Sequence, residues 1–397
     1  SWRWRLYVLT FVESVATILL ERGVYFFTTE RLGFGEVSNL TLALCFGVAY
    51  AVGALASHSV AERVGERRLL LGSLIGLAVV HAGIAAWPTG LPIAVGFTLI
   101  GLGSGLKWPV VESFLGAGLD ERQMRRALGR FNVTWSTAVP LTVGAAGLLV
   151  AFAPAWVFFA AVVPMHAVSV VLALGMPREP EHGRDEGGAA ATDAIDEAGL
   201  AWRWRLLWSA RWLLVGACAL AFLIAPLVPE IFARLGQGPA VAGWLAGLLD
   251  AARLAVFVVF MAWGGWHGRA WPMVVAMAAL PAGTAMVLFG GSVAMVVAGE
   301  VLFGLAMGAV YYAALYYALV VKRAAVDAGG IHEALIGGGF AIGPAIGLLG
   351  IGMAGWVGGA TAGLLVGVLP WVAVTTALGV AGLAGVGPGQ RRAAARG

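Results

Sequence analysis

Ionisable side chains that fall within long apolar stretches are the residues of this chain that could carry chemistry. Each costs on the order of 2.5–3.5 kcal/mol to place inside a membrane, so each requires a partner, a wet cavity or a function. Lys107 and Glu13 both lie roughly 12–15 Å from the same face, at about 1.5 Å per residue. We expect them to pair, either at a substrate or coupling site that includes Trp108 or as a structural link between two helices.

Four further residues are candidates for carrying protons. Glu300 has no basic neighbour in the sequence, and a lone carboxyl group within a membrane is a possible proton carrier. His332 and Glu333 are adjacent, and histidine titrates near neutral pH. Interfacial hydrogen bonding is the alternative for both. Glu21 is next to Arg22, and these two form either a local gate or an ion pair between helices.

The remaining charges in the apolar stretches, and one aromatic stripe, have both structural and functional interpretations. Asp250 and Arg253 are three residues apart, so they either neutralise each other along one helix face or contribute to a gate. Glu112 needs a partner of its own, because about 140° separates it from the lysine on the same helix. We expect that partner in the basic loop at 118–131, and a helix-end charge near the headgroups is the alternative. Tyr312 and Tyr316 share one helix face and either pack or contact a substrate.

The composition excludes a soluble globular protein. Of 397 residues, 60% are hydrophobic, 12% are charged and 58 are glycine. Apolar runs of about 18 residues or more recur along the chain, as in membrane-spanning helices. We predict an all-α integral membrane protein with twelve transmembrane helices in two pseudo-symmetric six-helix halves. Their approximate ranges are 5–27, 38–57, 69–87, 91–117, 132–153, 155–176, 211–233, 239–262, 271–289, 293–320, 330–351 and 360–386.

Arginine and lysine residues gather on one side of the predicted spans. We count 20 on that side and only 2, Arg31 and Arg234, on the other, which predicts that both termini are cytoplasmic. Of all 25 Lys and Arg residues in the chain, only two are lysines, as in GC-rich bacterial genomes, so we expect the bacterial inner membrane. Residues 177–210 are polar and predict a cytoplasmic linker between six-helix bundles at 1–176 and 211–397.

The two predicted bundles are related by an internal repeat. Residues 96–115 align without gaps with residues 299–318, 203 positions later, and the glycines at 96, 101 and 105 coincide with those at 299, 304 and 308. The lysine and the glutamate of the first copy correspond to Val310 and Leu315 in the second. We therefore expect two halves that keep one packing surface but differ in charge.

Two six-helix halves, a central linker and cytoplasmic termini resemble the major facilitator superfamily over the whole chain. The family's loop between the second and third spans has the pattern G-x-x-x-D-R-x-G-R-R. Residues 58–68 keep its acid, Glu62, and the arginines Arg63 and Arg67, but not its first glycine. Residues 339–347, within the eleventh predicted span, are similar to the family's G-x-x-x-G-P-x-x-G-G exporter signature.

The resemblance implies parallel repeats around a central cavity, lined by spans one, four, seven and ten, with the loop charges in a gating role. Glu13 and Lys107 would then lie on one wall of the cavity, with Tyr312 and Tyr316 on the other. The segment LERGVYFF resembles the E-x-x-E-R-F motif of proton-coupled peptide transporters, although its first acid and its aromatic residue are replaced.

Several function classes are excluded by what the sequence lacks. It has no P-loop, no Cys/His metal pattern and no soluble domain that could hold an active site, so we predict no enzyme, cofactor or metal. The basic residues follow membrane topology, so we expect no nucleic-acid partner. We predict a monomeric, proton-coupled secondary transporter that contacts membrane lipid and moves a small anionic or amphipathic solute by alternating access. An exporter of lipophilic compounds or drugs, and a transport-fold sensor, scaffold or lipid-handling protein, stay open as alternatives.

Overall fold

The computed structural model describes residues 2–117, 119, 121–178, 197–321 and 327–385, which form helices and no strand. The side chain of His332, a predicted proton carrier, lies outside the described residues. The helices are α1 (Arg3–Glu21), α2 (Gly23–Leu32), α3 (Glu36–Val64), α4 (Glu66–Ala86), α5 (Gly90–Gly116), α6 (Glu121–Phe152), α7 (Ala155–Ala160), α8 (Val163–Leu174), α9 (Glu197–Arg234), α10 (Pro239–Ala262), α11 (Trp271–Phe289), α12 (Val293–Val321), α13 (Asp327–Gly352), α14 (Ala354–Val357) and α15 (Ala360–Ala384).

Eleven of the described helices are long and apolar enough to cross a membrane, which supports the predicted all-helical membrane protein. The first predicted span, 5–27, is divided: α1 ends at Glu21 and α2 begins at Gly23, with Arg22 between them. A Cβ atom at Gly23 would lie 2.6 Å from the Cβ of Ala146, so glycine allows α2 to lie directly on α6. Because its charged residues interrupt its apolar run, α1 is not among the eleven.

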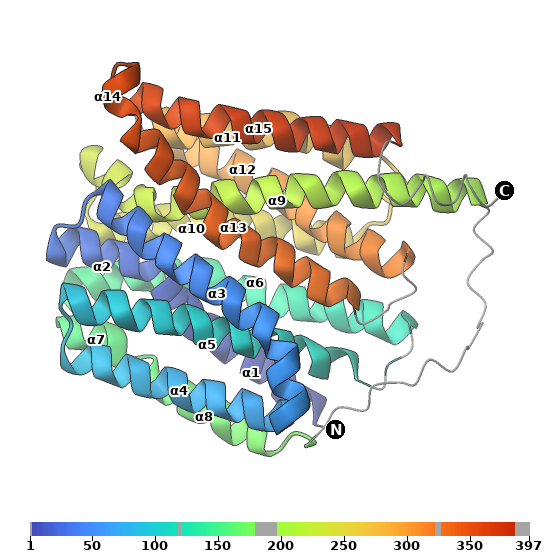
Figure 1. Cartoon of the computed structure of the whole chain (residues 1–397), viewed down its shortest axis with the longest axis horizontal. Coiled ribbons are helices and arrows are strands. Elements are labelled where there is room, and N and C mark those ends of the chain that lie inside the picture. The colour runs from blue at the N-terminus through green and yellow to red at the C-terminus, as the bar shows by residue number, and fades with distance from the viewer. Residues whose placement is uncertain (1, 118, 120, 179–196, 322–326, 386–397) are drawn as a thin grey trace.

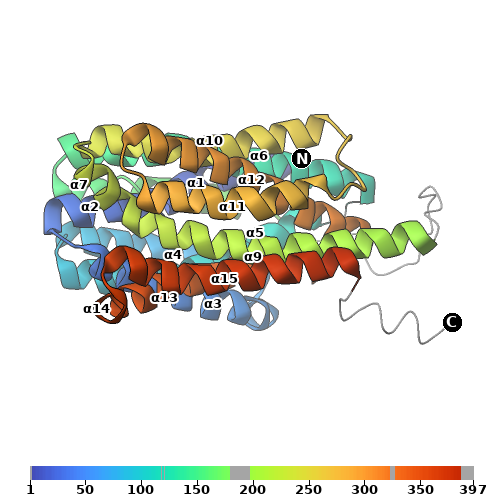
Figure 2. The same cartoon turned by 90° about the horizontal axis from the view of Figure 1, so that it is seen from above.

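The helices run side by side along one axis, and the two parts of the chain lie next to each other (Figures 1 and 2). We call α1–α8 the N-terminal set and α9–α15 the C-terminal set. On the right in Figure 1, α8 ends and α9 begins at the same end of the molecule, where α1 also begins and α15 ends. We call this the linker end.

The same close helix crossing occurs once in each set. A Cβ atom added to Gly101 would lie 2.5 Å from the carbonyl oxygen of Phe46, so the backbones of α5 and α3 are in contact. A Cβ atom on Gly304 would overlap the carbonyl oxygen of Leu249, which brings α12 onto α10 in the same way. Both members of the second crossing lie 203 positions after those of the first. The aligned glycines thus have the same packing role in both sets.

The closest contacts between the two sets are along two helix pairs, α3–α13 and α6–α10. A Cβ atom on Gly47 of α3 would overlap the carbonyl oxygen of Phe340 of α13. A Cβ atom on Gly147 of α6 would overlap the carbonyl oxygen of Pro239 of α10. Small residues at these crossings let backbones of different sets approach closely, and the pairs α3–α13 and α6–α10 therefore flank the space between the sets.

Two segments predicted as connections are largely helical. The predicted loop 58–68 is reduced to Gly65 between α3 and α4, with φ of +89°, a left-handed value that glycine adopts readily. The first helix of the C-terminal set begins at Glu197, so it includes the last part of the predicted linker, 177–210. That part is rich in Ala, Leu and Arg, which are good helix formers, so the helix continues beyond the apolar run.

Replacing Gly105 with alanine should destabilise the protein, because a Cβ atom there would overlap the carbonyl oxygen of Tyr50 at the α3–α5 crossing. Overpacking of this kind costs about 1–3 kcal/mol, so we expect a lower melting temperature for the purified protein in detergent. Gly76→Ala in α4 is the matched control, because no atom lies within 4 Å of the added Cβ and alanine favours helix. Equal melting temperatures for the two variants would contradict this prediction.

Candidate functional site

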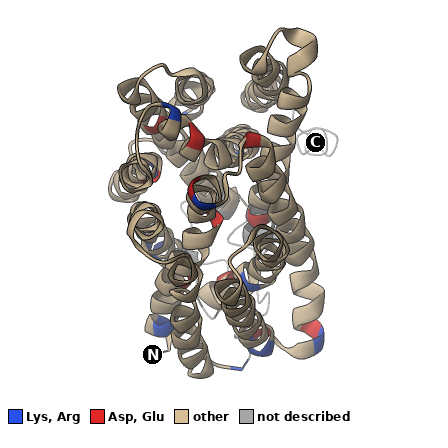
Figure 3. Cartoon of the chain, turned by 90° about the vertical axis from the view of Figure 1, so that its left-hand side faces the viewer, with Lys and Arg blue, Asp and Glu red and all other residues tan. Residues whose placement is uncertain are grey.

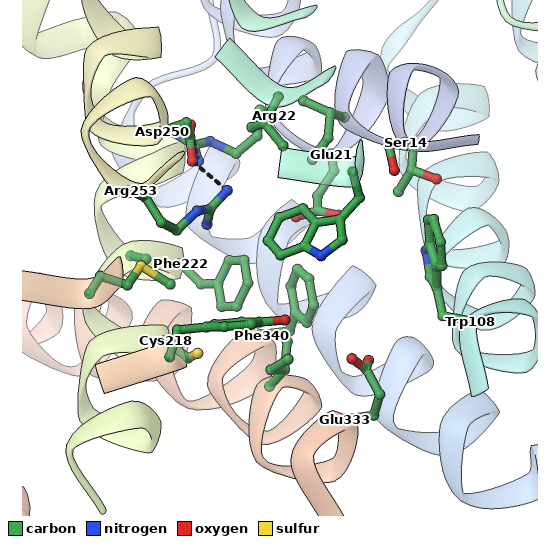
Figure 4. Close-up of a pocket in the computed structure, with 18 of the residues that line it drawn as sticks. Ser14, Glu21, Arg22, Trp108, Cys218, Phe222, Asp250, Arg253, Glu333 and Phe340 are labelled. Carbon is green, nitrogen blue, oxygen red and sulfur yellow. Dashed lines mark hydrogen bonds and ion pairs between the residues drawn. The ribbon is translucent and has the colours of Figure 1, made fainter. Parts of the chain in front are cut away.

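A central cavity lies between the two helix sets (Figure 4). Its volume is about 140 Å³, and its wall consists of α1, α3, α5 and α6 from one set and α9, α10, α12 and α13 from the other. A cavity of this size has room for a small organic molecule. The residues that border it are Ser14, Thr17, Ile18, Glu21, Arg22, Tyr50, Trp108, Glu112, Phe131, Trp135, Val139, Cys218, Ala221, Phe222, Leu249, Asp250, Arg253, Met307, Tyr311, Glu333, Ile336 and Phe340.

One part of the wall carries ion pairs that join the two sets. Seen end-on, acidic and basic residues lie on helices in the middle of the bundle as well as at its rim (Figure 3). Arg22 approaches Asp250 of α10 with 3.3 Å between Nη1 and Oδ2, and Asp250 also pairs with Arg253 at 2.9 Å. The guanidinium of Arg253 lies 4.9 Å from the ring centroid of Trp135. Three residues predicted for gating therefore meet at the cavity, and Glu21, a predicted proton carrier, borders it beside them (Figure 4).

Another part of the wall carries two carboxyl groups from different sets. Glu112 of α5 and Glu333 of α13 are in hydrogen-bonding contact. The hydroxyl of Tyr50 on α3 donates to Glu333 Oε2 at 3.1 Å. Among the ion pairs of the described residues, none includes either carboxyl group. Among the described residues, the partner of Glu112 is therefore another acid. The side chains of Arg122 and Arg125, in the basic loop where we expected a partner, lie outside the described residues.

Aromatic side chains form much of the remaining wall. Phe222 and Phe340 are stacked, with ring centroids 3.7 Å apart and 20° between the ring planes. The ring of Tyr50 lies 4.8 Å from that of Phe340, and Trp135 lies 5.7 Å from Tyr311. The cavity thus combines aromatic faces with four carboxyl groups and two guanidinium groups.

The predicted pair of Lys107 and Glu13 forms, but away from the cavity. Lys107 Nζ lies 2.7 Å from Glu13 Oε2 and donates to Thr17 Oγ1 at 3.1 Å. Both charged side chains are fully buried, and neither borders the cavity. His166 Nδ1 lies 3.0 Å from Glu13 Oε1, and the ring of His81 lies 5.0 Å from that of His166. These four titratable groups come from α1, α4, α5 and α8, so the cluster lies inside the N-terminal set.

The two predicted substrate-facing tyrosines contact other aromatic residues instead of the cavity. Tyr316 stacks on His267 with 4.4 Å between ring centroids, and Tyr312 meets Trp266 edge-on at 5.8 Å. The neighbouring Tyr311 borders the cavity. Successive residues point about 100° apart on a helix, so a shift of one position separates a cavity side chain from one that packs elsewhere.

The other predicted residues divide between the cavity, the core and the surface. Trp108 borders the cavity, whereas Glu300 is buried in α12 and does not border it. Glu62 and Arg63 are exposed near the linker end. Arg67 donates to a backbone carbonyl just after α8, at 2.8 Å, so it links α4 to α8 within one set.

Sequence reasoning missed Tyr50, His81 and His166. Each lies alone in an apolar segment, so its spacing gives no signal. The repeat contains one signal for Tyr50, because this residue corresponds to Arg253 at the offset of 203 positions and both border the cavity. Within the described residues, no group of three or more His, Cys, Asp or Glu side chains could hold a metal ion.

Comparison with known proteins identifies the family. A family model described as Major Facilitator Superfamily matches residues 8–225. No curated protein matches the chain. Among solved structures, the chain is similar to a bacterial homolog of the human lysosomal transporter Spinster in an inward-facing, unoccupied conformation. The two share 14% identity at a TM-score of 0.66, over 97% of this chain and 96% of that one.

Two further solved structures have the same fold. One is a POT family transporter in complex with a thioalcohol-conjugated peptide, with 13% identity and a TM-score of 0.71 over 95% of each chain. The other is the nucleoside transporter NupG, with 11% identity and a TM-score of 0.67 over 97% of this chain and 99% of that one. At these identities the likeness shows the fold. Together with the family match, it points to a transporter and not to an enzyme.

The family match covers more than half of the sequence, and the similar structures cover nearly all of it. The chain belongs to the major facilitator superfamily.

Proposed function

We propose that this protein is a secondary active transporter that moves a small amphipathic solute across a membrane by alternating access. The observation that supports the proposal most directly is the central cavity whose wall is shared by the two helix sets. A solute bound there contacts both sets at once, so its binding free energy can change their relative position.

The cavity lining favours a solute with a positive charge and an apolar ring. Its two guanidinium groups, Arg22 and Arg253, both pair with Asp250, and three further carboxyl groups border the cavity. A protonated amine can pair with a carboxylate and lie over an aromatic face. The anionic solute predicted from the sequence depended on Lys107, whose ammonium pairs with Glu13 away from the cavity. We therefore propose an organic cation, with the anion as the alternative.

Location and coupling are part of the same proposal. The excess of basic residues, 20 against 2, supports a bacterial inner membrane protein with both termini in the cytoplasm. Carboxyl groups within the helices, such as Glu21, Glu300 and Glu333, support proton coupling, because membrane-embedded acids form proton relays in transporters. One chain supplies both walls of the cavity, so a monomer surrounded by lipid suffices.

Phenethylamine should raise the melting temperature of the detergent-purified protein more than 3-phenylpropionate, a carboxylate of similar size. A ligand of the folded state stabilises it by about 2.7 kcal/mol at 100 times its Kd. Asp250→Asn should remove most of the shift, because it leaves two arginines without their carboxylate. Glu30→Gln, an exposed change, should keep it. If 3-phenylpropionate stabilises more and Lys107→Met removes that effect, the anion replaces the cation.

Trp135→Ala should slow gradient-driven uptake of labelled phenethylamine into proteoliposomes by about tenfold, because it removes an aromatic face from the cavity. Trp263→Ala is the matched control, since this tryptophan is exposed just after α10 and does not border the cavity. If solutes bind but none crosses the membrane under any gradient, the sensor, scaffold or lipid-handling alternative replaces transport.

Lys107→Met should lower the melting temperature strongly, because it leaves the buried Glu13 carboxylate without its ammonium partner. Breaking a buried ion pair in this way costs about 3–5 kcal/mol. The double variant Glu13→Gln/Lys107→Met should recover part of the loss, since neither charge then remains. Thermal unfolding in detergent measures both, and a single variant as stable as the unmodified protein would refute a structural role for the pair.

A further inference from the structure

The two carboxyl groups that touch across the cavity belong to different helix sets and lie near one end of the molecule. Glu112 is four residues before the end of α5, and Glu333 is six residues after the start of α13. Both therefore lie roughly 6–9 Å from the linker end, at about 1.5 Å per residue. In an alternating-access cycle the two sets move relative to each other, so this contact is made in some states and lost in others.

The contact requires a proton. Two ionised carboxylates have no hydrogen-bond donor between them and repel each other, so one member of a hydrogen-bonded pair must be protonated. Tyr50 indicates which one: its hydroxyl donates to Glu333 Oε2 at 3.1 Å. A donor of this kind suits a carboxylate at Glu333, which leaves the proton on Glu112.

The surroundings of the pair provide no competing cation among the described residues. The two guanidinium groups that border the cavity, Arg22 and Arg253, both pair with Asp250, at 3.3 Å and 2.9 Å. On α4, Glu66 accepts a hydrogen bond from the hydroxyl of Ser113. The side chain of His332 lies outside the described residues and is therefore included in the test. The titratable groups that face the pair from the packed helices are Glu21 of α1, Tyr50 of α3, Cys218 of α9, Arg253 of α10 and Tyr311 of α12.

We propose that Glu112 and Glu333 form one proton-binding site shared by the two helix sets, in which the bound proton holds the linker end closed. Loss of the proton leaves two carboxylates that repel each other across the α5–α13 contact, and the linker end opens. The hydrogen bond from Tyr50 of α3 to Glu333 of α13 also joins the two sets, so it stabilises the closed linker end together with the proton. The site rests on the proposed function only for its use in transport.

The test measures opening of the linker end directly and needs no substrate. Spin labels at Arg68→Cys and Arg269→Cys, two exposed positions near that end in different sets, report the distance between the sets. The chain's own cysteines, Cys45 and Cys218, are first replaced with alanine. The distance distribution of the full-length protein in lipid nanodiscs is recorded by electron paramagnetic resonance from acidic to alkaline pH. We expect the distance to lengthen reversibly as the pH rises.

Two substitutions separate this site from other causes of pH dependence. In Glu112→Gln and in Glu333→Gln, the amide supplies an N–H donor to the remaining carboxylate at any pH, so the distance should stay short throughout. A response that persists unchanged in both variants would overturn the proposal. A response that is lost in Glu300→Gln or His332→Gln, and kept in the two variants of the pair, would overturn it as well.

A third substitution tests the role of the tyrosine. Tyr50→Phe should keep the response but move its midpoint to lower pH by about one unit, because the closed state loses one hydrogen bond between the two sets. A midpoint that stays in place or moves to higher pH would contradict the assigned role. If a glutamine variant does not fold, the pH series of spin-label distances in the protein that keeps Glu112 and Glu333 still tests the proposal. A distance that does not depend on pH in that protein overturns it.

The outcome also distinguishes this site from the proposed function. A pH-dependent opening in a protein that carries no solute in proteoliposomes would remove the proposed transport and support the proton site. A distance independent of pH in a protein that transports phenethylamine would remove the proton site and support the transport.

Discussion

A charge buried inside a membrane bundle must be neutralised by another group, and this constraint decides how the polar residues of this protein are arranged. Lys107 and Glu13 neutralise each other between helices of one set, at 2.7 Å and without exposure. Arg22 and Asp250 do so between helices of different sets, at 3.3 Å. The first pair holds one set together, whereas the second holds the two sets to each other. A buried ion pair therefore stabilises either one set or the contact between the two sets, depending on which helices carry its two residues.

The close helix contacts at glycine positions fix the helices that carry these charged side chains. Because α5 touches α3 and α12 touches α10 through backbone atoms at matching positions, each set has little freedom to repack at the wall of the cavity. The two copies of the repeat keep the same glycine contacts but carry different side chains at the cavity. Tyr50 and Arg253 occupy matching positions, and one donates a hydrogen bond to a carboxyl group while the other pairs with Asp250. Aligned positions of the internal repeat thus place chemically different groups on two walls of one cavity.

Three features of this chain could be predicted without coordinates. Long apolar runs predicted the helices, and the offset of 203 positions predicted which glycines have the same packing role. The similar distances of Glu13 and Lys107 from the predicted cytoplasmic face predicted that these two residues pair. Each of these is a property of composition, of the repeat or of position along a helix. None requires knowledge of how a helix is rotated about its own axis.

That rotation was decided only by the tertiary structure. Helices such as α5 and α12 are apolar on nearly every face, so no hydrophobic stripe indicates which side faces the cavity. Because successive residues point about 100° apart, the sequence determined that charged and aromatic residues lie in these helices but not where they point. Packing against neighbouring helices turned Lys107 away from the cavity, selected Tyr311 over Tyr312, and brought Glu112 to Glu333 across the two sets.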